Sequence, residues 1–302
     1  MTTLRPPSTW QLAHHSLPLG HRTLVMAVLN ITPDSFSDGG LYLHPDSAIT
    51  HALHLLDSGA DILDLGAEST RPGSHAGHPA AALVSAAQEQ HRLLPVLEGI
   101  LRARPSAILS IDTYKAATAR AALAAGAAIL NDVSGFHWDT EMPSVCAHAR
   151  CGVVLMHTRG RPDQWPTQAP LPPEALLPNI LDGLSSSLAL ASQAGIHPSA
   201  IVLDPGYGFG KRLDENFSLL RRQPQLLALG HPLLVGLSRK SFLTHALQQA
   251  AIPGTASPNA REDASIAALT AAILAGASIV RVHQPGPARA AAAIADAILA
   301  AR

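Results

Sequence analysis

Eight polar or charged residues stand at the ends of short apolar segments, and their side-chain types indicate what they could bind. Asp and Asn provide hydrogen-bond acceptors and amide donors, which suit a flat heterocycle with several N–H groups. Arg, Lys and His suit phosphate oxygens. A pocket that presents both kinds would recognise a nitrogen heterocycle carrying a phosphate or diphosphate. The residues are Asn30, Arg71, Asp112, Asn131, Asp204, Lys240, Arg281 and His283.

Each of these residues also has a plain structural interpretation, because Asp and Asn favour helix N-caps and loops. We expect Asp46 and Asp214 to be residues of that kind, near helix starts. For any single position the two interpretations are about equally good. Capping alone explains the whole set poorly, so we expect one shared site.

The apolar segments are interpreted as parallel strands, each followed by a helix. The first, 24–29, is apolar throughout, as expected of a strand buried on both faces. The alternation repeats over roughly 250 residues, which predicts the α/β class and a single (β/α)8 TIM barrel with its active site at the C-terminal strand ends. A doubly wound open sheet is the alternative, but no G-x-G-x-x-G opens the first helix. The expected strands are 24–29, 61–66, 107–111, 128–130, 153–156, 201–203, 233–236 and 278–282.

The whole chain is divided into an N-terminal extension, 1–20, and a barrel domain, 21–302. The extension could fold as a small hairpin that closes one end of the barrel. The Pro- and Gly-containing stretches 158–173 and 251–260 are expected to be loops within the barrel. The main helices are expected at about 79–103, 140–150, 174–194, 214–228, 261–275 and 287–301.

Composition limits the possible partners. The net charge of −1 gives no indication of nucleic acid or a membrane surface as a partner. No apolar run approaches the length of a spanning helix, and we expect no signal peptide. The two cysteines are too few for a disulfide framework and indicate a reduced, cytoplasmic protein. The 16 histidines follow no metal-ligand pattern.

The segment Asp204–Lys211 contains three glycines, which would let the backbone approach a ligand closely. Phe209 could form a wall beside a flat ring. A simple glycine-rich turn is the alternative. The segment is not a P-loop, because no G-K-[ST] begins a helix there.

Together these motifs resemble bacterial dihydropteroate synthase, a member of the pterin-binding family. The resemblance extends over about residues 24–284. The segments that carry it are 29–40 (L-N-I-T-P-D-S-F-S-D-G-G), 64–73 (D-L-G-A-E-S-T-R-P-G), 110–115, 131–135, 204–206 onward, 236–242 and 279–283.

The resemblance implies a transferase of folate biosynthesis and a sulfonamide target. Such an enzyme joins p-aminobenzoate to (7,8-dihydropterin-6-yl)methyl diphosphate, giving 7,8-dihydropteroate and diphosphate. The family is a TIM barrel, is usually homodimeric, and uses Mg²⁺ with the diphosphate. Its partners are small molecules, with neither nucleic acid nor membrane among them.

The resemblance also implies roles for the residues that hold the pterin. Asp204 would pair with the ring N3–H and 2-amino group, and Asn131 with the 2-amino edge and a ring nitrogen. Asp112 would accept from N8–H, and Lys240 would reach the ring carbonyl and N5. Arg281 would stack on the pterin and contact phosphate.

Other implied roles concern the diphosphate, the arylamine and the loops. His283 and Asn30 would hold the diphosphate, Asn30 through Mg²⁺ as the implied metal ligand. Thr70 and Arg71 would help to close the site. The p-aminobenzoate would be surrounded by Asp34, Phe36, Ser241 and Lys240. The remaining expected substrate-binding residues are Met156 and Phe209. The implied catalytic residues are Asp34, Asp112, Lys240 and Arg281.

We expect a dissociative substitution. Departure of diphosphate would leave a methylene cation conjugated with the dihydropterin, which a weakly nucleophilic arylamine can attack without a strong base. Asp34 would stabilise the developing positive charge, and closure of the first two loops would exclude water.

Two rival functions remain open. A methyltetrahydrofolate–corrinoid methyltransferase would bind pterin on the same barrel but would not need the Thr32–Asp38 loop or the cationic grip of Arg281 and His283. An inactive paralogue would bind pterin without turnover. The chain also departs from the family pattern at 158–160, at 212–216, at Gln284 and in the 158–173 loop.

Overall fold

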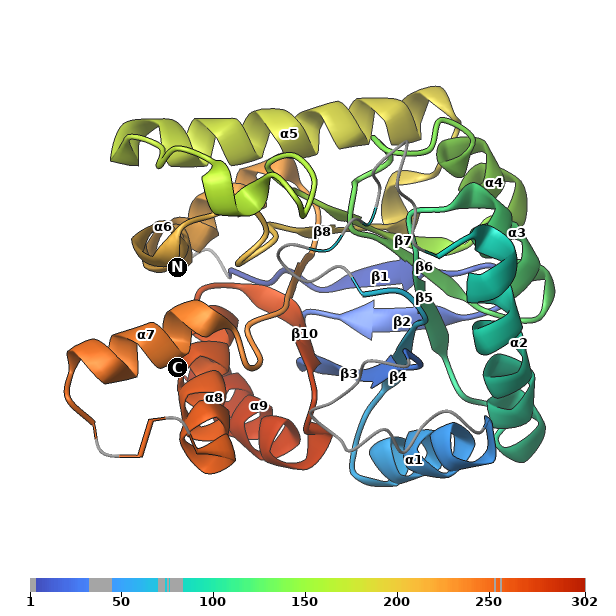
Figure 1. Cartoon of the computed structure of the whole chain (residues 1–302), viewed down its shortest axis with the longest axis horizontal. Helices are drawn as coiled ribbons and strands as arrows, with labels where there is room; N and C mark the ends of the chain where they lie inside the picture. The colour runs from blue at the N-terminus through green and yellow to red at the C-terminus, as the bar shows by residue number, and fades with distance from the viewer. Residues whose placement is uncertain are drawn as a thin grey trace.

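The computed structural model describes residues 4–32, 45–69, 74, 76, 84–252, 254–255 and 257–301. Its centre is a closed barrel of eight parallel strands in the order β10-β3-β4-β5-β6-β7-β8-β9 (Figure 1). The predicted TIM barrel is therefore confirmed. The strands are β3 (Leu24–Asn30), β4 (Ile62–Gly66), β5 (Leu109–Asp112), β6 (Ile129–Asp132), β7 (Gly152–Met156), β8 (Ile201–Asp204), β9 (Leu233–Val235) and β10 (Ala277–Val282).

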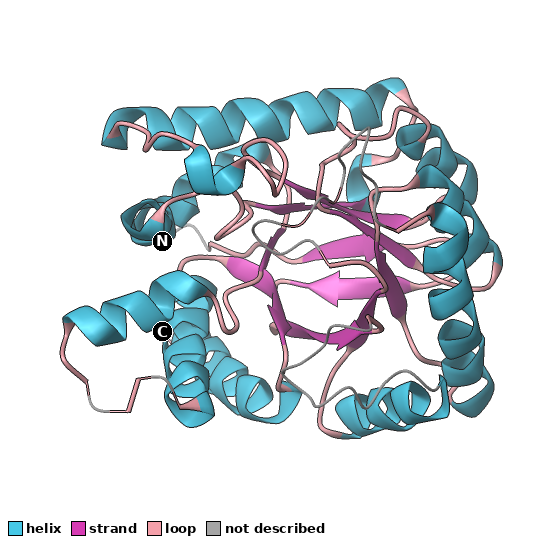
Figure 2. Cartoon of the chain, in the orientation of Figure 1, coloured by secondary structure: helices cyan, strands magenta, loops and turns pink. Residues whose placement is uncertain are grey.

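Helices surround the barrel on its outside (Figure 2). They are α1 (Pro45–Asp57), α2 (Ala86–Ala103), α3 (Ala116–Ala124), α4 (Met142–Ala149), α5 (Pro173–Gln193), α6 (Leu213–Arg222), α7 (Ser241–Gln249), α8 (Pro258–Leu274) and α9 (Pro285–Ala300). None of them, within the residues described, is both long enough and apolar enough to cross a membrane.

Each strand buries both of its faces, and alternate residues face opposite sides. In β4 the outward residues Leu63 and Leu65 pack into the large cluster beneath the helices. The inward residue Ile62 packs in a second cluster inside the barrel. Two residues further along the same inward row stands Asp64, which is fully buried. The barrel interior is therefore apolar in its N-terminal half and polar towards the C-terminal strand ends.

A hairpin closes the apolar end of the barrel. Strands β1 (Ser8–Gln11) and β2 (Ser16–Leu19) pair antiparallel. Trp10, Leu12 and Leu19 are buried against the inward apolar residues, and Trp10 Nε1 donates to the Ala200 carbonyl at 2.8 Å. The N-terminal segment thus acts as an apolar plug on the side of the barrel away from the polar residues.

Two of the expected helices differ in the structure. The helix expected at 214–228 ends as an α-helix at Arg222 and continues as a 3-10 helix, η4 (Gln223–Leu229). Pro224 lacks the N–H that an α-helical hydrogen bond would require, so regular α-helix cannot continue through it. The helix expected from about 79 begins at Ala86, where Ser85 accepts from the Gln88 N–H at 3.2 Å in a capping box.

Candidate active site

The polar half of the barrel interior is organised around one buried carboxylate, that of Asp64. Its Oδ2 accepts from Arg281 Nε at 2.6 Å and from Asn131 Nδ2 at 2.9 Å. Arg281 also donates from Nη2 to Asp112 Oδ2 at 2.8 Å. Three of the residues predicted to bind pterin therefore meet in one hydrogen-bonded cluster, which spans strands β4, β5, β6 and β10.

The charged groups in this cluster differ in how readily they change protonation. Arg281 faces Asp64 and Asp112, which raise the pKa of its guanidinium. Burial raises the pKa of Asp112 to about 7, because the loss of solvation and the neighbouring carboxylates outweigh the attraction of Arg281. Asp112 can therefore change its protonation near neutral pH, while Arg281 remains a fixed cation.

A second group of predicted residues lies at the ends of β8 and β9. Asp204 is the last residue of β8, and its Oδ1 accepts from the Gly206 N–H at 2.7 Å. Burial raises the pKa of the Asp204 carboxyl. The Lys240 ammonium lies 3.9 Å from the ring centroid of Phe209, over its face. Burial lowers the pKa of Lys240 to about 8, and Asp204 partly opposes that shift.

The glycine-rich loop is held in an unusual backbone conformation. Gly206, Gly208 and Gly210 all have φ between 69° and 79°. A Cβ on Gly206 would overlap the carbonyl oxygen of His157, so only glycine fits there. Lys211 Nζ donates to the carbonyls of Gly206 and His157 at 2.8 and 3.2 Å. This loop is thus pinned against the end of β7, which fixes the position of Asp204 and Phe209.

The other predicted residues that the structure describes lie around the same opening. Asn30 ends β3 and is half buried, and His283 follows β10 with its Nδ1 2.9 Å from Ser238 Oγ. Met156 ends β7 and packs with Tyr114 and Val133, beside Phe209. Ser241 is exposed as the first residue of α7, with Lys240 at the N-cap.

Four predicted residues lie outside the described part of the chain. They are Asp34, Phe36, Thr70 and Arg71. Their roles therefore stay predictions.

Sequence reasoning gave no role to Asp64 or Lys211. Asp64 belongs to the 64–73 segment but stands two residues before the end of β4, and the predicted site residues are those at strand ends. The signal that could have found it is its place in the inward row of β4, where a charge interrupts an otherwise apolar strand. Lys211 is the last residue of the glycine-rich segment 204–211. Its side chain is buried, and burial lowers its pKa to about 7.

Comparison with known proteins identifies the family. The sequence pattern of the family described as pterin binding enzymes matches residues 26–283. The chain belongs to that family. It is 39% identical to the dihydropteroate synthase of Bacillus subtilis, over 89% of this chain and 86% of that protein.

Solved structures of family members have the same fold. The dihydropteroate synthase of Yersinia pestis, crystallised with a sulfonamide drug, superposes with a TM-score of 0.85 at 35% identity, covering 97% of this chain and 100% of that one. The dihydropteroate synthase of Xanthomonas albilineans, crystallised with 4-aminobenzoic acid, gives 0.83 at 34% identity, covering 98% and 100%. Similarity to the family thus extends over nearly the whole chain.

Proposed function

We propose that this protein is a dihydropteroate synthase of folate biosynthesis. It would join p-aminobenzoate to (7,8-dihydropterin-6-yl)methyl diphosphate and release diphosphate. The observation that carries the proposal is that Asp112, Asn131, Asp204, Lys240 and Arg281 all lie at the polar end of one barrel. This arrangement combines acceptors for ring N–H groups with cations for phosphate, in a chain similar to dihydropteroate synthases over most of its length.

The inward acceptors suit the pterin ring. Asp204 keeps Oδ2 available, since its Oδ1 accepts from Gly206, and it can take up the N3–H and 2-amino group of the pterin. Asn131 is oriented by Asp64, which fixes its amide nitrogen as the donor towards that carboxylate. The amide oxygen of Asn131 can then face the 2-amino edge.

The cations suit the leaving group. The Arg281 side chain is 22% exposed, and His283 follows it by two residues, immediately after β10, so both cations lie at the C-terminal end of this strand. Positive charge near the diphosphate stabilises its departure, and the dihydropterin nitrogens can share the charge left on the methylene carbon. We infer that the arylamine then attacks this cation without a strong general base. Asp34, predicted from the sequence, would lie close to that charge.

Mg²⁺ is proposed as a companion of the diphosphate. Among the residues that the structure describes, no group of three or more His, Cys, Asp or Glu side chains could hold a metal ion. The Asn30 amide oxygen is a hard ligand of the kind that Mg²⁺ accepts, and Mg²⁺ commonly takes its other ligands from substrate phosphates and water. The donor set therefore fits an ion brought with the substrate, which would neutralise charge on the leaving diphosphate.

A homodimer and a cytoplasmic location are also proposed. Ile294 and Ile298 lie one turn apart on α9 and are 63% and 54% exposed, which supports burial of this helix face against a second copy. Cys146 and Cys151 are both free and buried, as suits a reducing compartment. Light scattering of the protein and of Ile294→Glu would test the dimer: the parent should have twice the mass of the variant.

The function is tested by turnover. The protein is mixed with the pterin diphosphate, p-aminobenzoate and Mg²⁺, and diphosphate release and dihydropteroate formation are followed together. Equal amounts of both products, with none when p-aminobenzoate is omitted, are expected. Pterin binding without turnover would favour the inactive paralogue. Equal affinity for pterins with and without diphosphate would favour the methyltransferase.

Sulfonamides should compete with p-aminobenzoate. They share the arylamine group and have a sulfonamide group, whose N–H is acidic, in place of the carboxylate. A sulfonamide that raises the KM for p-aminobenzoate without changing kcat would support a shared subsite.

A further inference from the structure

We propose that Trp165, Arg159 and Glu215 are positioning residues for Phe209, so that the 158–173 loop fixes one wall of the pterin subsite from outside the barrel. The inference rests on the proposed function, since it assigns Phe209 to pterin. It concerns two segments, the 158–173 loop and residues 212–216, where the chain departs from the family pattern.

Phe209 lies between the loop and the site. Its ring packs against that of Trp165 with centroids 5.2 Å apart and an interplanar angle of 88°, an edge-to-face contact. Over its face lies the Lys240 ammonium at 3.9 Å. Trp165 is 8% exposed and donates from Nε1 to the Gly160 carbonyl at 3.3 Å. The Phe209 ring thus links the 158–173 loop to Lys240, a residue predicted to bind the pterin.

The loop also lies directly on the backbone next to Phe209. A Cβ built on Gly210 would come within 2.7 Å of the Arg159 carbonyl oxygen and 3.0 Å of Trp165 Cδ1. Arg159 Nη1 donates to the Gly210 carbonyl at 3.1 Å, and its Nη2 donates to the Ala169 carbonyl at 3.0 Å. Arg159 therefore links the glycine-rich loop, at Gly210, to the far part of the 158–173 loop, at Ala169.

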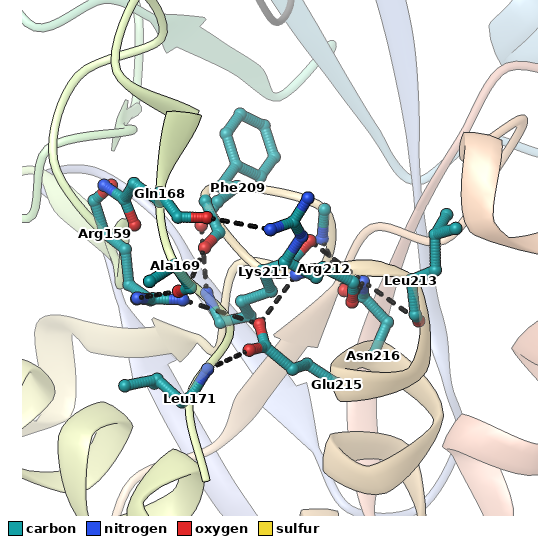
Figure 3. Close-up of polar contacts among 12 residues, drawn as sticks. Arg159, Gln168, Ala169, Leu171, Phe209, Lys211, Arg212, Leu213, Glu215 and Asn216 are labelled. Atoms are coloured by element: carbon teal, nitrogen blue, oxygen red, sulfur yellow. Dashed lines mark hydrogen bonds and ion pairs between the residues drawn. The ribbon is translucent and has the colours of Figure 1, made fainter. Parts of the chain in front are cut away.

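Glu215 secures this arrangement from α6 (Figure 3). Its carboxylate lies 3.5 Å from Arg159 Nη1 and is largely buried. Oε1 accepts from the Leu171 N–H and Oε2 from the Arg212 N–H, both at 2.6 Å. Arg212 in turn donates to the Gln168 carbonyl at 3.1 Å. The two departing segments therefore bind each other through charge-assisted hydrogen bonds.

The glycine-rich loop needs support of this kind. Three glycines alternate with Tyr207 and Phe209, and glycine provides no side chain that could hold the backbone in one conformation. Lys211 fixes the loop from the inside by donating to backbone carbonyls. The position of the Phe209 ring therefore depends on its neighbours, which include Trp165 and Lys240 as well as the apolar cluster around Met156.

The plain alternative is that the 158–173 loop only covers apolar surface on α5 and α6. The two ideas differ in what they expect of Lys240. If Trp165 positions Phe209, its removal should let Phe209 move and readmit water to the ammonium, so the pKa of Lys240 should rise from about 8. If the loop only covers the surface, removal of Trp165 should lower the folding stability and leave the pKa of Lys240 unchanged.

The experiment compares Trp165→Ala, Trp165→Phe and Glu215→Gln with the parent. The control is Arg222→Ala, which removes a hydrogen bond of 2.7 Å from α6 to the Pro173 carbonyl but does not contact the glycine-rich loop. Amide hydrogen exchange of residues 204–212 is measured without ligand. We expect exchange about tenfold faster in Trp165→Ala and Glu215→Gln, with little change in Trp165→Phe and Arg222→Ala.

Calorimetry with the pterin diphosphate and the pH profile of kcat/KM complete the test. Trp165→Ala should bind about tenfold more weakly and move the basic limb of its profile to higher pH, and Trp165→Phe should restore both. Unchanged exchange at 204–212 in both Trp165→Ala and Glu215→Gln would overturn the positioning role. A parent protein that does not bind the pterin would overturn the proposed function, while the exchange measurement would still decide the role of the loop.

Discussion

Arg281 and Asp64 form the central ion pair of the barrel, with Nε 2.6 Å from Oδ2. The sequence led us to expect Arg281 to contact pterin and phosphate. In the structure its guanidinium is held by two carboxylates, those of Asp64 and Asp112. The carboxylates limit the rotamers that this long side chain can adopt, so Arg281 is oriented before a ligand arrives.

Asp64→Asn should impair both pterin binding and folding stability. One carboxylate oxygen, Oδ2, accepts from both Arg281 and Asn131, while Oδ1 is buried without a partner. An asparagine could keep both bonds through its amide oxygen, but it would lose the negative charge that pairs with Arg281 and would place its NH₂ group in the unpartnered position of Oδ1. Removing one partner of a buried charge pair typically costs about 3–5 kcal/mol. Because Arg281 would still pair with Asp112, part of this loss should be avoided. Urea unfolding should give a loss of roughly 2–4 kcal/mol, and calorimetry should show weaker pterin binding. Parent-like values in both would mean that Asp64 does not orient the site.

Catalysis should depend on pH through two titrating groups at the polar end of the barrel. Asp112 has a pKa of about 7 and must lose its proton to accept from the pterin N8–H. Lys240 has a pKa of about 8 and loses its positive charge above that pH. The profile of kcat/KM should therefore be bell-shaped, with an acidic limb near 7 and a basic limb near 8. Asp112→Asn should remove the acidic limb and leave the basic one. The profile is measured between pH 6 and 9 in steps of about one pH unit. A flat profile over this range would contradict both assignments.

Asp204→Asn should weaken pterin binding. Asp204 Oδ1 already accepts from Gly206, so only Oδ2 is left for the ligand. An asparagine that keeps the Gly206 bond would present its NH₂ group to the pterin N–H groups. A charge-assisted hydrogen bond contributes about 1.5–3 kcal/mol, so affinity should fall by about one to two orders of magnitude. Calorimetry with a bare pterin measures this without the diphosphate, and unchanged affinity would rule the contact out.

The sequence predicted the barrel because strand periodicity and polar strand ends are local signals. It also predicted which residues line the opening, including Asp112, Asn131 and Arg281. Their partners were harder to predict, because the contact between Arg281 and Asp64 joins residues 217 positions apart. Nothing in the local sequence indicates which carboxylate an arginine will select. The same applies to Arg159 and Glu215, whose contact depends on how a loop after β7 meets the start of α6.

Trp10→Ala should destabilise the protein and leave the chemistry intact. Trp10 is 1% exposed and packs on the apolar inward residues at the end of the barrel opposite the polar cluster. Truncation of a buried tryptophan commonly costs about 3–5 kcal/mol, and the Ala200 carbonyl would also lose its donor. Urea unfolding should show that loss, while kcat of the folded fraction stays within about twofold of the parent. A selective fall in kcat would show that the hairpin influences the site.

Arg281→Ala should separate the two tasks of this side chain towards the ligand. It is expected to weaken binding of the diphosphate-bearing pterin more than binding of the bare pterin, because only the former has the charge that the guanidinium would meet. Calorimetry with both ligands makes the comparison. If both lose the same affinity, Arg281 contributes to the ring and not to the phosphate.

The same variant should also acquire an altered dependence of stability on pH. Arg281 lowers the pKa of Asp112, so its removal should raise that pKa above about 7. A carboxyl whose pKa is higher in the folded than in the unfolded state binds more protons when folded, so its contribution to stability is lost as pH rises through the folded pKa. The free energy of unfolding of Arg281→Ala should therefore fall more steeply than that of the parent between about pH 6 and 8, by up to 1.36 kcal/mol per pH unit. Adding Asp112→Asn to the variant removes the titrating group and should flatten the curve. If the free energy of unfolding of the double variant falls with pH as steeply as that of Arg281→Ala, another group near the barrel opening is the one that titrates.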